Sequence, residues 1–211
     1  KSSEILEGRV KTLHPKIHAG ILNKRKNKKH IKEMKKNNFE NIDLVVVNFY
    51  PFEKIIKKTK NNKKIVENID IGGPSLVRAA AKNYNDVTVI TSSDQYKDLI
   101  NQLNVNNGRT TINFRKRMSQ IAFSETAYYD SIISNYFNKN NNNFYPKKIT
   151  HHSKLIEILR YGENPHQTGA VYSINNSLNL NQIHGKKLSY NNYNDINAAL
   201  TISKSLPNNL G

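Results

Sequence analysis

Two short runs of aliphatic and β-branched residues, 43–47 and 86–91, constrain the fold of this chain more than any other feature. The first run is continuous and bounded by polar residues, as is typical of a parallel strand buried on both faces. Helical patterns at 52–58 and 63–68, and a third that begins near Pro74, lie between the two runs. The alternation of strands and helices predicts an α/β fold with a parallel sheet and right-handed crossovers.

The remaining elements are expected around this unit. Apolar residues keep a helical period from Thr111 to Phe137, which predicts a long amphipathic helix packed on the first domain. Its expected core positions are Phe114, Met118, Ile121, Ala122, Tyr129, Ile132, Ile133 and Tyr136. Further expected elements are helices at 31–39 and 94–103, a strand at 153–160, and a helix from about Ile196 with Asp195 as its cap.

A cation-rich segment at residues 8–20 precedes all of these elements. It gathers Arg9, Lys11, Thr12 and two imidazoles, and both Pro15 and the irregular apolar spacing argue against a helix. In an extended backbone, Arg9 and Lys11 project to the same side. The segment is therefore a candidate anion site, and a solvated basic loop is the alternative.

Polar groups also follow the first predicted strand. Asn48 and Tyr50 come directly after it, where open α/β sheets usually bind ligands. The alternative for Tyr50 is a rim aromatic whose hydroxyl lies in water.

A helix start follows Asp70. Gly72 and Gly73 allow close backbone approach, and Pro74 suits a first helical turn. The free amides there can hold an anion or a polarised carbonyl. Further along, Lys82 shares one helix face with Arg78, and a plain polar face is the alternative for both.

Composition narrows the class of protein. The chain carries 33 Lys and Arg against 16 Asp and Glu, a formal charge of +17, which would attract polyanions. However, the basic runs at 24–29 and 57–64 lack interleaved aromatics, and the abundance of Asn, Ile and Tyr matches a drift towards A/T-rich codons. Because of these features of the basic runs, we do not expect a nucleic-acid binder. The absence of Cys excludes disulfides and thiolate metal sites. No apolar run approaches the roughly 20 residues of a membrane span, so we expect a cytoplasmic protein that is not membrane-bound.

Five motifs, in this order and spacing, resemble one family. They are Arg9-Val10-Lys11-Thr12-Leu13-His14-Pro15, Asn48-Phe49-Tyr50-Pro51-Phe52, Asn68-Ile69-Asp70-Ile71-Gly72-Gly73, Arg78-Ala79-Ala80-Ala81-Lys82-Asn83 and Leu159-Arg160-Tyr161-Gly162-Glu163-Asn164-Pro165-His166-Gln167. The family is that of bifunctional purine biosynthesis enzymes, in which phosphoribosylaminoimidazolecarboxamide formyltransferase is joined to IMP cyclohydrolase.

The resemblance implies a domain plan. Residues 1–137 are expected to be a parallel-sheet, methylglyoxal-synthase-like cyclohydrolase domain that is incomplete at its N-terminus. Residues 138–150 are expected to form an Asn-rich linker, and residues 151–211 to begin an α/β, cytidine-deaminase-like formyltransferase domain. The family's N-terminal strand and phosphate loop would precede Lys1, and the transferase's Lys-His pair would follow Gly211.

The resemblance also implies the site residues. Lys82, Lys11, Tyr50 and Asp70 match catalytic positions of the cyclohydrolase, with Lys82 as proton donor or acceptor. Arg9, Thr12, Asn48 and Gly72 match substrate-binding positions of the same domain. In the formyltransferase, the matching positions are Arg160, Tyr161 and Asn192.

The resemblance also implies which ligands and which assembly to expect. Ring closure needs neither metal nor cofactor, whereas the transferase takes 10-formyltetrahydrofolate as co-substrate. The expected ligands are purine ribonucleotides, and the expected assembly is a homodimer. A catalytically inactive fragment and a basic nucleic-acid-binding module remain the alternatives.

Overall fold

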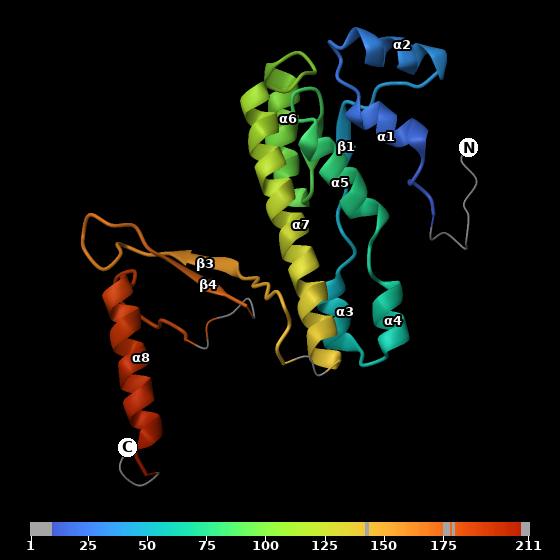
Figure 1. The fold of residues 1–211 in the computed structure, drawn as a ribbon. Coiled ribbons are helices and arrows are strands. Elements are labelled where there is room, and N and C mark those ends of the chain that lie inside the picture. Colours follow the sequence, from blue (N-terminus) through green and yellow to red (C-terminus); the bar gives the residue numbers. More distant parts are fainter. Residues whose placement is uncertain (1–9, 142–143, 175–177, 179, 208–211) are drawn as a thin grey trace. The chain divides into compact units, whose positions relative to one another are not determined.

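The computed structural model describes residues 10–141, 144–174, 178 and 180–207 (Figure 1). The chain divides into two compact units, one up to Thr150 and one from His151. The first unit comprises α1 (Pro15–Leu22), α2 (Lys28–Lys36), β1 (Leu44–Val46), α3 (Phe52–Lys58), α4 (Asn62–Glu67), α5 (Gly72–Lys82), β2 (Thr88–Ile90), the 3-10 helix η1 (Ser93–Gln95), α6 (Tyr96–Val105) and α7 (Ile112–Asn140). The second unit comprises β3 (Lys154–Ile158), β4 (Ala170–Ser173) and α8 (Tyr190–Ser205).

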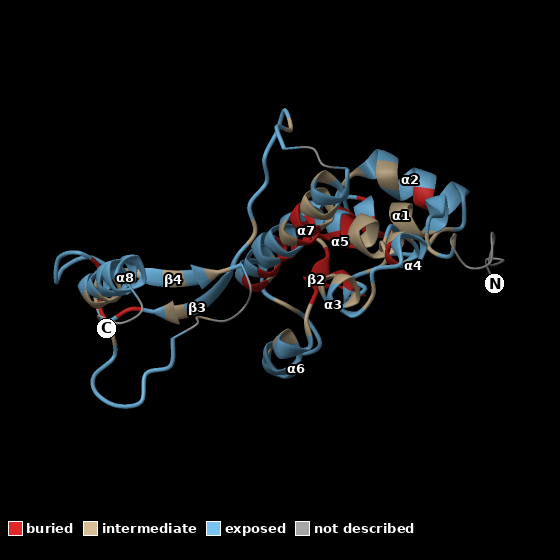
Figure 2. Ribbon diagram, turned by 90° about the horizontal axis from the view of Figure 1, so that it is seen from below, coloured by how far each residue is buried: buried red, intermediate tan, exposed pale blue. Residues whose placement is uncertain are grey.

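The two predicted strands pair in parallel. In register, Val45 of β1 lies opposite Val89 of β2, and α3, α4 and α5 form the crossover between them. The helix α5 packs on both strands and on α7, and buried residues gather in β2, α5 and α7 (Figure 2). The core contains Val77, Val89 and Phe114, so the predicted α/β unit with its parallel sheet is confirmed.

The prediction that the first strand is buried on both faces is wrong for the described residues. Val45 is buried, but Leu44 and Val46 are 40% and 45% exposed. Among the described residues, β2 is the only strand in register with β1. Because side chains alternate along a strand, Leu44 and Val46 share the face that the core does not cover.

The long helix α7 is confirmed, and it continues to Asn140, three residues beyond the predicted end. Its core face includes Phe114 and Met118, whereas Ile121 is 37% exposed, contrary to expectation. The core face instead includes buried Ser119, whose hydroxyl donates to the carbonyl oxygen of Ala81 at 2.8 Å. A small hydroxyl can be buried where its hydrogen bond is satisfied, so hydrophobicity alone misplaces the face of such a helix.

The prediction that the segment around Pro15 is not helical is wrong, because α1 begins at that proline. Proline is well suited to the first helical position, where its missing N–H would have no partner within the helix. His14 caps this helix, since its Nδ1 accepts a hydrogen bond from the backbone N–H of Lys16 at 3.1 Å.

A second hydrophobic cluster joins α3 and α4 to the C-terminal half of α7. Phe52, Ile65, Tyr129 and Ile132 form its buried centre. The ring of Phe52 meets those of Tyr129 and Tyr136 edge-on, at centroid distances of 6.2 and 5.7 Å. This cluster fixes the position of Tyr129.

In the second unit, β3 and β4 pair antiparallel, with a register shift between Leu155 and Glu157. The predicted start of the last helix near Ile196, with Asp195 as cap, is wrong. The helix α8 begins at Tyr190, because Ser189 and Asn192 form a reciprocal capping box, and Asp195 lies inside the helix. None of the described helices combines the length and apolar character that crossing a membrane requires.

Candidate functional site

The start of α5 brings several predicted site residues together. The backbone N–H of Gly73 donates to Oδ1 of Asp70 at 2.8 Å, so the aspartate satisfies one of the free amides of the first turn. A Cβ atom at Gly72 would lie 2.8 Å from the hydroxyl oxygen of Thr12. Thr12 and Asp70 therefore both lie against the first turn of α5.

Asn48 and Tyr50 follow the carboxyl end of β1, and the side chain of Tyr50 is 56% exposed. The ring of Phe49, the residue before Tyr50, lies with its centre 5.2 Å from that of Tyr129, whose hydroxyl contacts the Asp70 backbone. This places Tyr50 on the same side of the unit as the Asp70 loop. Lys11 is exposed and lies next to Thr12 in sequence, whereas Arg9 lies outside the described residues.

Tyr129 belongs to this site but was predicted only as a core residue. Its hydroxyl oxygen accepts the backbone N–H of Asp70 at 2.8 Å, and the residue is 6% exposed. Burial raises the pKa of Tyr129 above 10.0, and nearby Asp70, Asp130 and Tyr50 act in the same direction, while the hydrogen bond from Asp70 opposes them. The phenol therefore stays protonated at neutral pH. The helical periodicity of the sequence predicts that Tyr129 is buried, but it does not predict the hydrogen bond with Asp70.

A histidine–serine pair lies one turn further along α5. Nε2 of His18 lies 3.0 Å from the hydroxyl of Ser75, and Nδ1 of the same ring is 3.4 Å from the carbonyl oxygen of His14. The pair joins α1 to α5 beside the Thr12 contact. Sequence reasoning grouped His18 with the opening segment but could not identify Ser75 as its partner.

Lys82 lies at the opposite end of α5. Ten helical steps separate it from Gly72, which corresponds to about 15 Å along the axis. The helix α5 belongs to the crossover that returns the chain from the carboxyl end of β1 to the amino end of the parallel strand β2. It therefore runs antiparallel to both strands. Thr12, Tyr50 and Asp70 thus lie towards the carboxyl ends of the strands, and Lys82 lies towards their amino ends.

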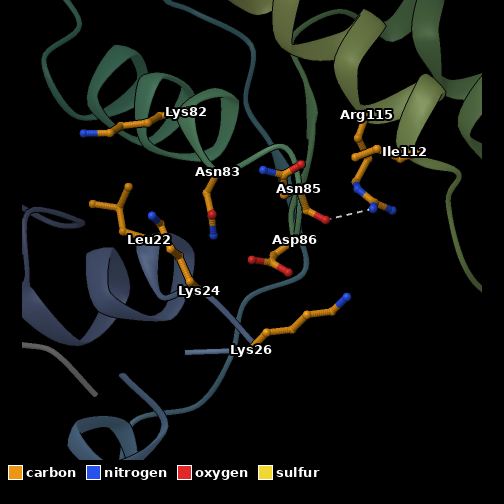
Figure 3. A pocket seen from close by; sticks show the side chains of 9 residues that line it. All are labelled: Leu22, Lys24, Lys26, Lys82, Asn83, Asn85, Asp86, Ile112 and Arg115. Atoms are coloured by element: carbon orange, nitrogen blue, oxygen red, sulfur yellow. Dashed lines mark hydrogen bonds between the residues drawn. The ribbon is translucent and has the colours of Figure 1, made fainter. Parts of the chain in front are cut away.

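Lys82 lines a pocket of about 690 Å³ there (Figure 3). Its neighbours around the pocket are Leu22, Lys24, Lys26, Asn83, Asn85, Asp86, Ile112 and Arg115. In Figure 3 the ammonium groups of Lys82 and Lys26 point in different directions. These two cations therefore do not converge on one anion.

The wall of this pocket is held by two residues. The amide Nδ2 of buried Asn83 donates to the carbonyl oxygens of Ile21 and Asn23, at 2.8 and 3.0 Å. The guanidinium of Arg115 donates to the carbonyl oxygens of Tyr84 and Asn85, both at 2.8 Å. Both side chains are engaged in structural hydrogen bonds.

The second unit brings two of its three predicted site residues into one pocket. Arg160 and Asn192 line a hollow of about 440 Å³ together with His184, Lys186 and Lys187. This excess of positive charge suits an anionic ligand. The guanidinium of Arg160 also lies 4.9 Å from the ring centre of Tyr161 and donates to its hydroxyl at 3.3 Å. Hydrogen bonds from Ser189 and Arg160 lower the pKa of Tyr161.

No cluster of three or more His, Cys, Asp or Glu suited to a metal ion occurs among the residues that the structure describes. The first unit offers a cation, hydroxyls and the amides of a helix start, and the pocket of the second unit offers several cations. Such groups bind anionic, oxygen-rich ligands and can stabilise charge that develops on an oxygen atom.

Comparison with known proteins agrees with the fold. A family model described as an MGS-like domain matches residues 1–75, and the model of the AICARFT/IMPCHase bienzyme matches residues 80–210. The first model defines the class of the α/β unit. Because the second covers more than half of the chain, this protein belongs to the AICARFT/IMPCHase bienzyme family.

Relatives agree with this assignment. The bifunctional purine biosynthesis protein PurH of Bradyrhizobium diazoefficiens is 47% identical over 200 residues, which cover 93% of this chain and 38% of the relative. PurH of Clostridioides difficile is 45% identical over 205 residues, 95% of this chain and 40% of the relative. The crystal structure of ForH matches with a TM-score of 0.56 and 30% identity, over 64% of this chain and 70% of that one. The chain thus spans about two fifths of the length of these PurH relatives.

Proposed function

We propose that this protein acts in purine biosynthesis, and that its first unit contributes to closing the ring of 5-formamidoimidazole-4-carboxamide ribonucleotide to give IMP. The observation that carries the proposal is the meeting of Thr12 and Asp70 at the first turn of α5, in a chain of the bienzyme family, with Tyr50 next in sequence to Phe49, which packs on Tyr129. The exposed Lys11 and the substrate-binding candidates Arg9, Asn48 and Gly72 complete the proposed set.

The reaction is a dehydration. The carboxamide nitrogen attacks the formyl carbon and loses a proton as the new C–N bond forms. The formamide nitrogen then loses its proton as a C=N bond forms and the C–O bond breaks, and the formyl oxygen, which takes up both protons, leaves as water. Negative charge grows on that oxygen during the attack. A cation such as Lys11 and a hydroxyl such as that of Tyr50 would stabilise it, and the Asp70 carboxylate would accept the nitrogen's proton.

Lys82 remains a proposed catalytic residue on the strength of the family motif alone. It lies about 15 Å along α5 from Gly72. A role in the same reaction therefore requires the substrate, or another chain, to reach the far end of this helix.

The test uses the full-length gene product. Conversion of the formylated ribonucleotide to IMP is followed by absorbance for the Lys11→Met and Lys82→Met variants, with Lys64→Met on the exposed surface of α4 as control. We expect Lys11→Met to lower kcat about 100-fold. Unchanged turnover in both the Lys11 and Lys82 variants would overturn the assignment.

We further propose that the second unit begins the formyltransferase, with Arg160, Tyr161 and Asn192 binding 5-aminoimidazole-4-carboxamide ribonucleotide and 10-formyltetrahydrofolate as formyl donor. The support is the cationic pocket that Arg160 and Asn192 line. A cytoplasmic homodimer is the assembly we propose. In the full-length gene product, Arg160→Ala should weaken ribonucleotide binding about tenfold, as measured by calorimetry. Unchanged affinity would remove Arg160 from the site.

A further inference from the structure

The hydrogen bond between Tyr129 and Asp70 joins residues 59 positions apart in sequence. It connects the buried face of α7 to the loop before α5. The ring of Tyr129 is fixed by its neighbours, with centroid distances of 5.2 Å to Phe49 and 6.2 Å to Phe52. The hydroxyl is thus carried on an immobilised ring, so its position is set by the core.

Asp70 is held at two points. The backbone N–H of Asp70 donates a hydrogen bond to the hydroxyl oxygen of Tyr129, and the carboxylate Oδ1 of Asp70 accepts one from the backbone N–H of Gly73. The second carboxylate oxygen, Oδ2, has no hydrogen-bond partner in the described part of the chain. The two bonds therefore fix the backbone and the plane of the carboxylate while they leave one oxygen available.

We propose that Tyr129 is a positioning residue of the ring-closing site, and that it acts by orienting the Asp70 carboxylate. This inference rests on the function proposed above. Without the Tyr129 hydroxyl, the Asp70 N–H loses its partner and the loop before α5 can rotate, which moves the carboxylate away from its productive orientation. Small errors in the position of a proton acceptor cost rate more than they cost substrate binding.

A purely structural role for Tyr129 is the competing explanation, and the same helix provides a matched control. The hydroxyl of Tyr136 donates to Oδ1 of Asn62 at 2.7 Å, and its ring also packs on Phe52. This bond ties α7 to α4, away from Asp70. Tyr129→Phe and Tyr136→Phe each remove one hydrogen-bonded hydroxyl from α7 and keep the aromatic ring.

The first experiment does not depend on activity. Amide hydrogen exchange of Asp70 in the full-length protein should become about fivefold faster in Tyr129→Phe, because the N–H loses this hydrogen bond. The same amide in Tyr136→Phe should exchange at the wild-type rate. Equal protection of Asp70 in all three proteins would overturn the inference.

The second experiment is a double-mutant cycle on ring closure. We expect Tyr129→Phe to lower kcat about tenfold with KM nearly unchanged, and to have less than about a twofold effect once Asp70→Asn is present. Equal effects in both backgrounds would show that Tyr129 does not act through Asp70. If Asp70→Asn alone leaves turnover unchanged, the proposed catalytic role of Asp70 fails, whatever the exchange experiment shows.

Discussion

The imidazole Nε2 of His18 lies 3.0 Å from the hydroxyl oxygen of Ser75. This contact joins α1 to α5 one turn from the place where Thr12 meets Gly72. The cation-rich opening segment is thus held to the helix by a partly buried hydrogen bond. The position of Thr12, and of Lys11 before it, depends on this connection.

Replacing either partner should weaken the attachment of α1. Ser75→Ala and His18→Ala should each lower the free energy of unfolding by about 1 kcal/mol, the usual net value of one hydrogen bond. The double variant should lose about as much as either single variant, because both remove the same interaction. Urea unfolding of the four proteins measures this coupling, and strictly additive losses would contradict it.

Gly73 should not tolerate a side chain. A Cβ atom there would clash with Oδ2 of Asp70 and come within 2.9 Å of its Cγ. We expect Gly73→Ala to push the carboxylate aside, lowering ring-closure kcat at least about tenfold. Steady-state assays and thermal unfolding of the same preparation distinguish displacement from unfolding. A folded variant with wild-type kcat would show that the carboxylate's position is unimportant.

Neighbouring Lys82 and Asn83 should differ sharply in their effect on stability. Asn83→Ala leaves the buried carbonyl oxygens of Ile21 and Asn23 without their donor, which should cost on the order of 3 kcal/mol. The exposed Lys82→Ala should change stability by less than about 0.5 kcal/mol. Denaturant titration of both variants provides the test, and similar losses would contradict it.

Tyr129 should make stability fall at alkaline pH. Its pKa in the folded protein is raised above 10.0, so folding favours the protonated phenol. This contribution is present below pH 10 and is lost as the pH rises through the folded pKa. Urea unfolding measured from pH 8 upward should therefore show a steeper alkaline decline for the wild type than for Tyr129→Phe. Parallel curves would mean that burial does not perturb this phenol.

Much of the fold could be predicted from local patterns. The parallel strands follow from their β-branched runs, and the helix at 52–58 was placed at its observed bounds. The predicted starts of two helices were wrong, because another local feature of the sequence determined where each helix begins. Pro15 begins a helix, because at the first position it lacks only a donor that would go unused. Ser189 starts α8 early, because its capping box with Asn192 satisfies the first turn.

The candidate site was only partly predictable. Tyr50 and Asp70 could be chosen because one follows a predicted strand and the other precedes a predicted helix, whereas Thr12 was chosen from the cation-rich segment and the family resemblance. Tyr129 could not be connected to them, since a bond across 59 positions depends on how α7 packs. The separation of Lys82 from Asp70 follows from the direction of α5, which matters only once that helix is placed against the sheet.

Because α5 is anchored at both ends, its length cannot vary freely. Asp70 fixes its first turn, while Asn83 binds carbonyl oxygens around α1 just beyond its last residue. Inserting one residue in the middle would turn one end by about 100° and shift it by about 1.5 Å relative to the other. Either the aspartate or the asparagine would then lose its partners. Insertions and deletions should therefore be far rarer within α5 in functional homologues than in the loops beside it.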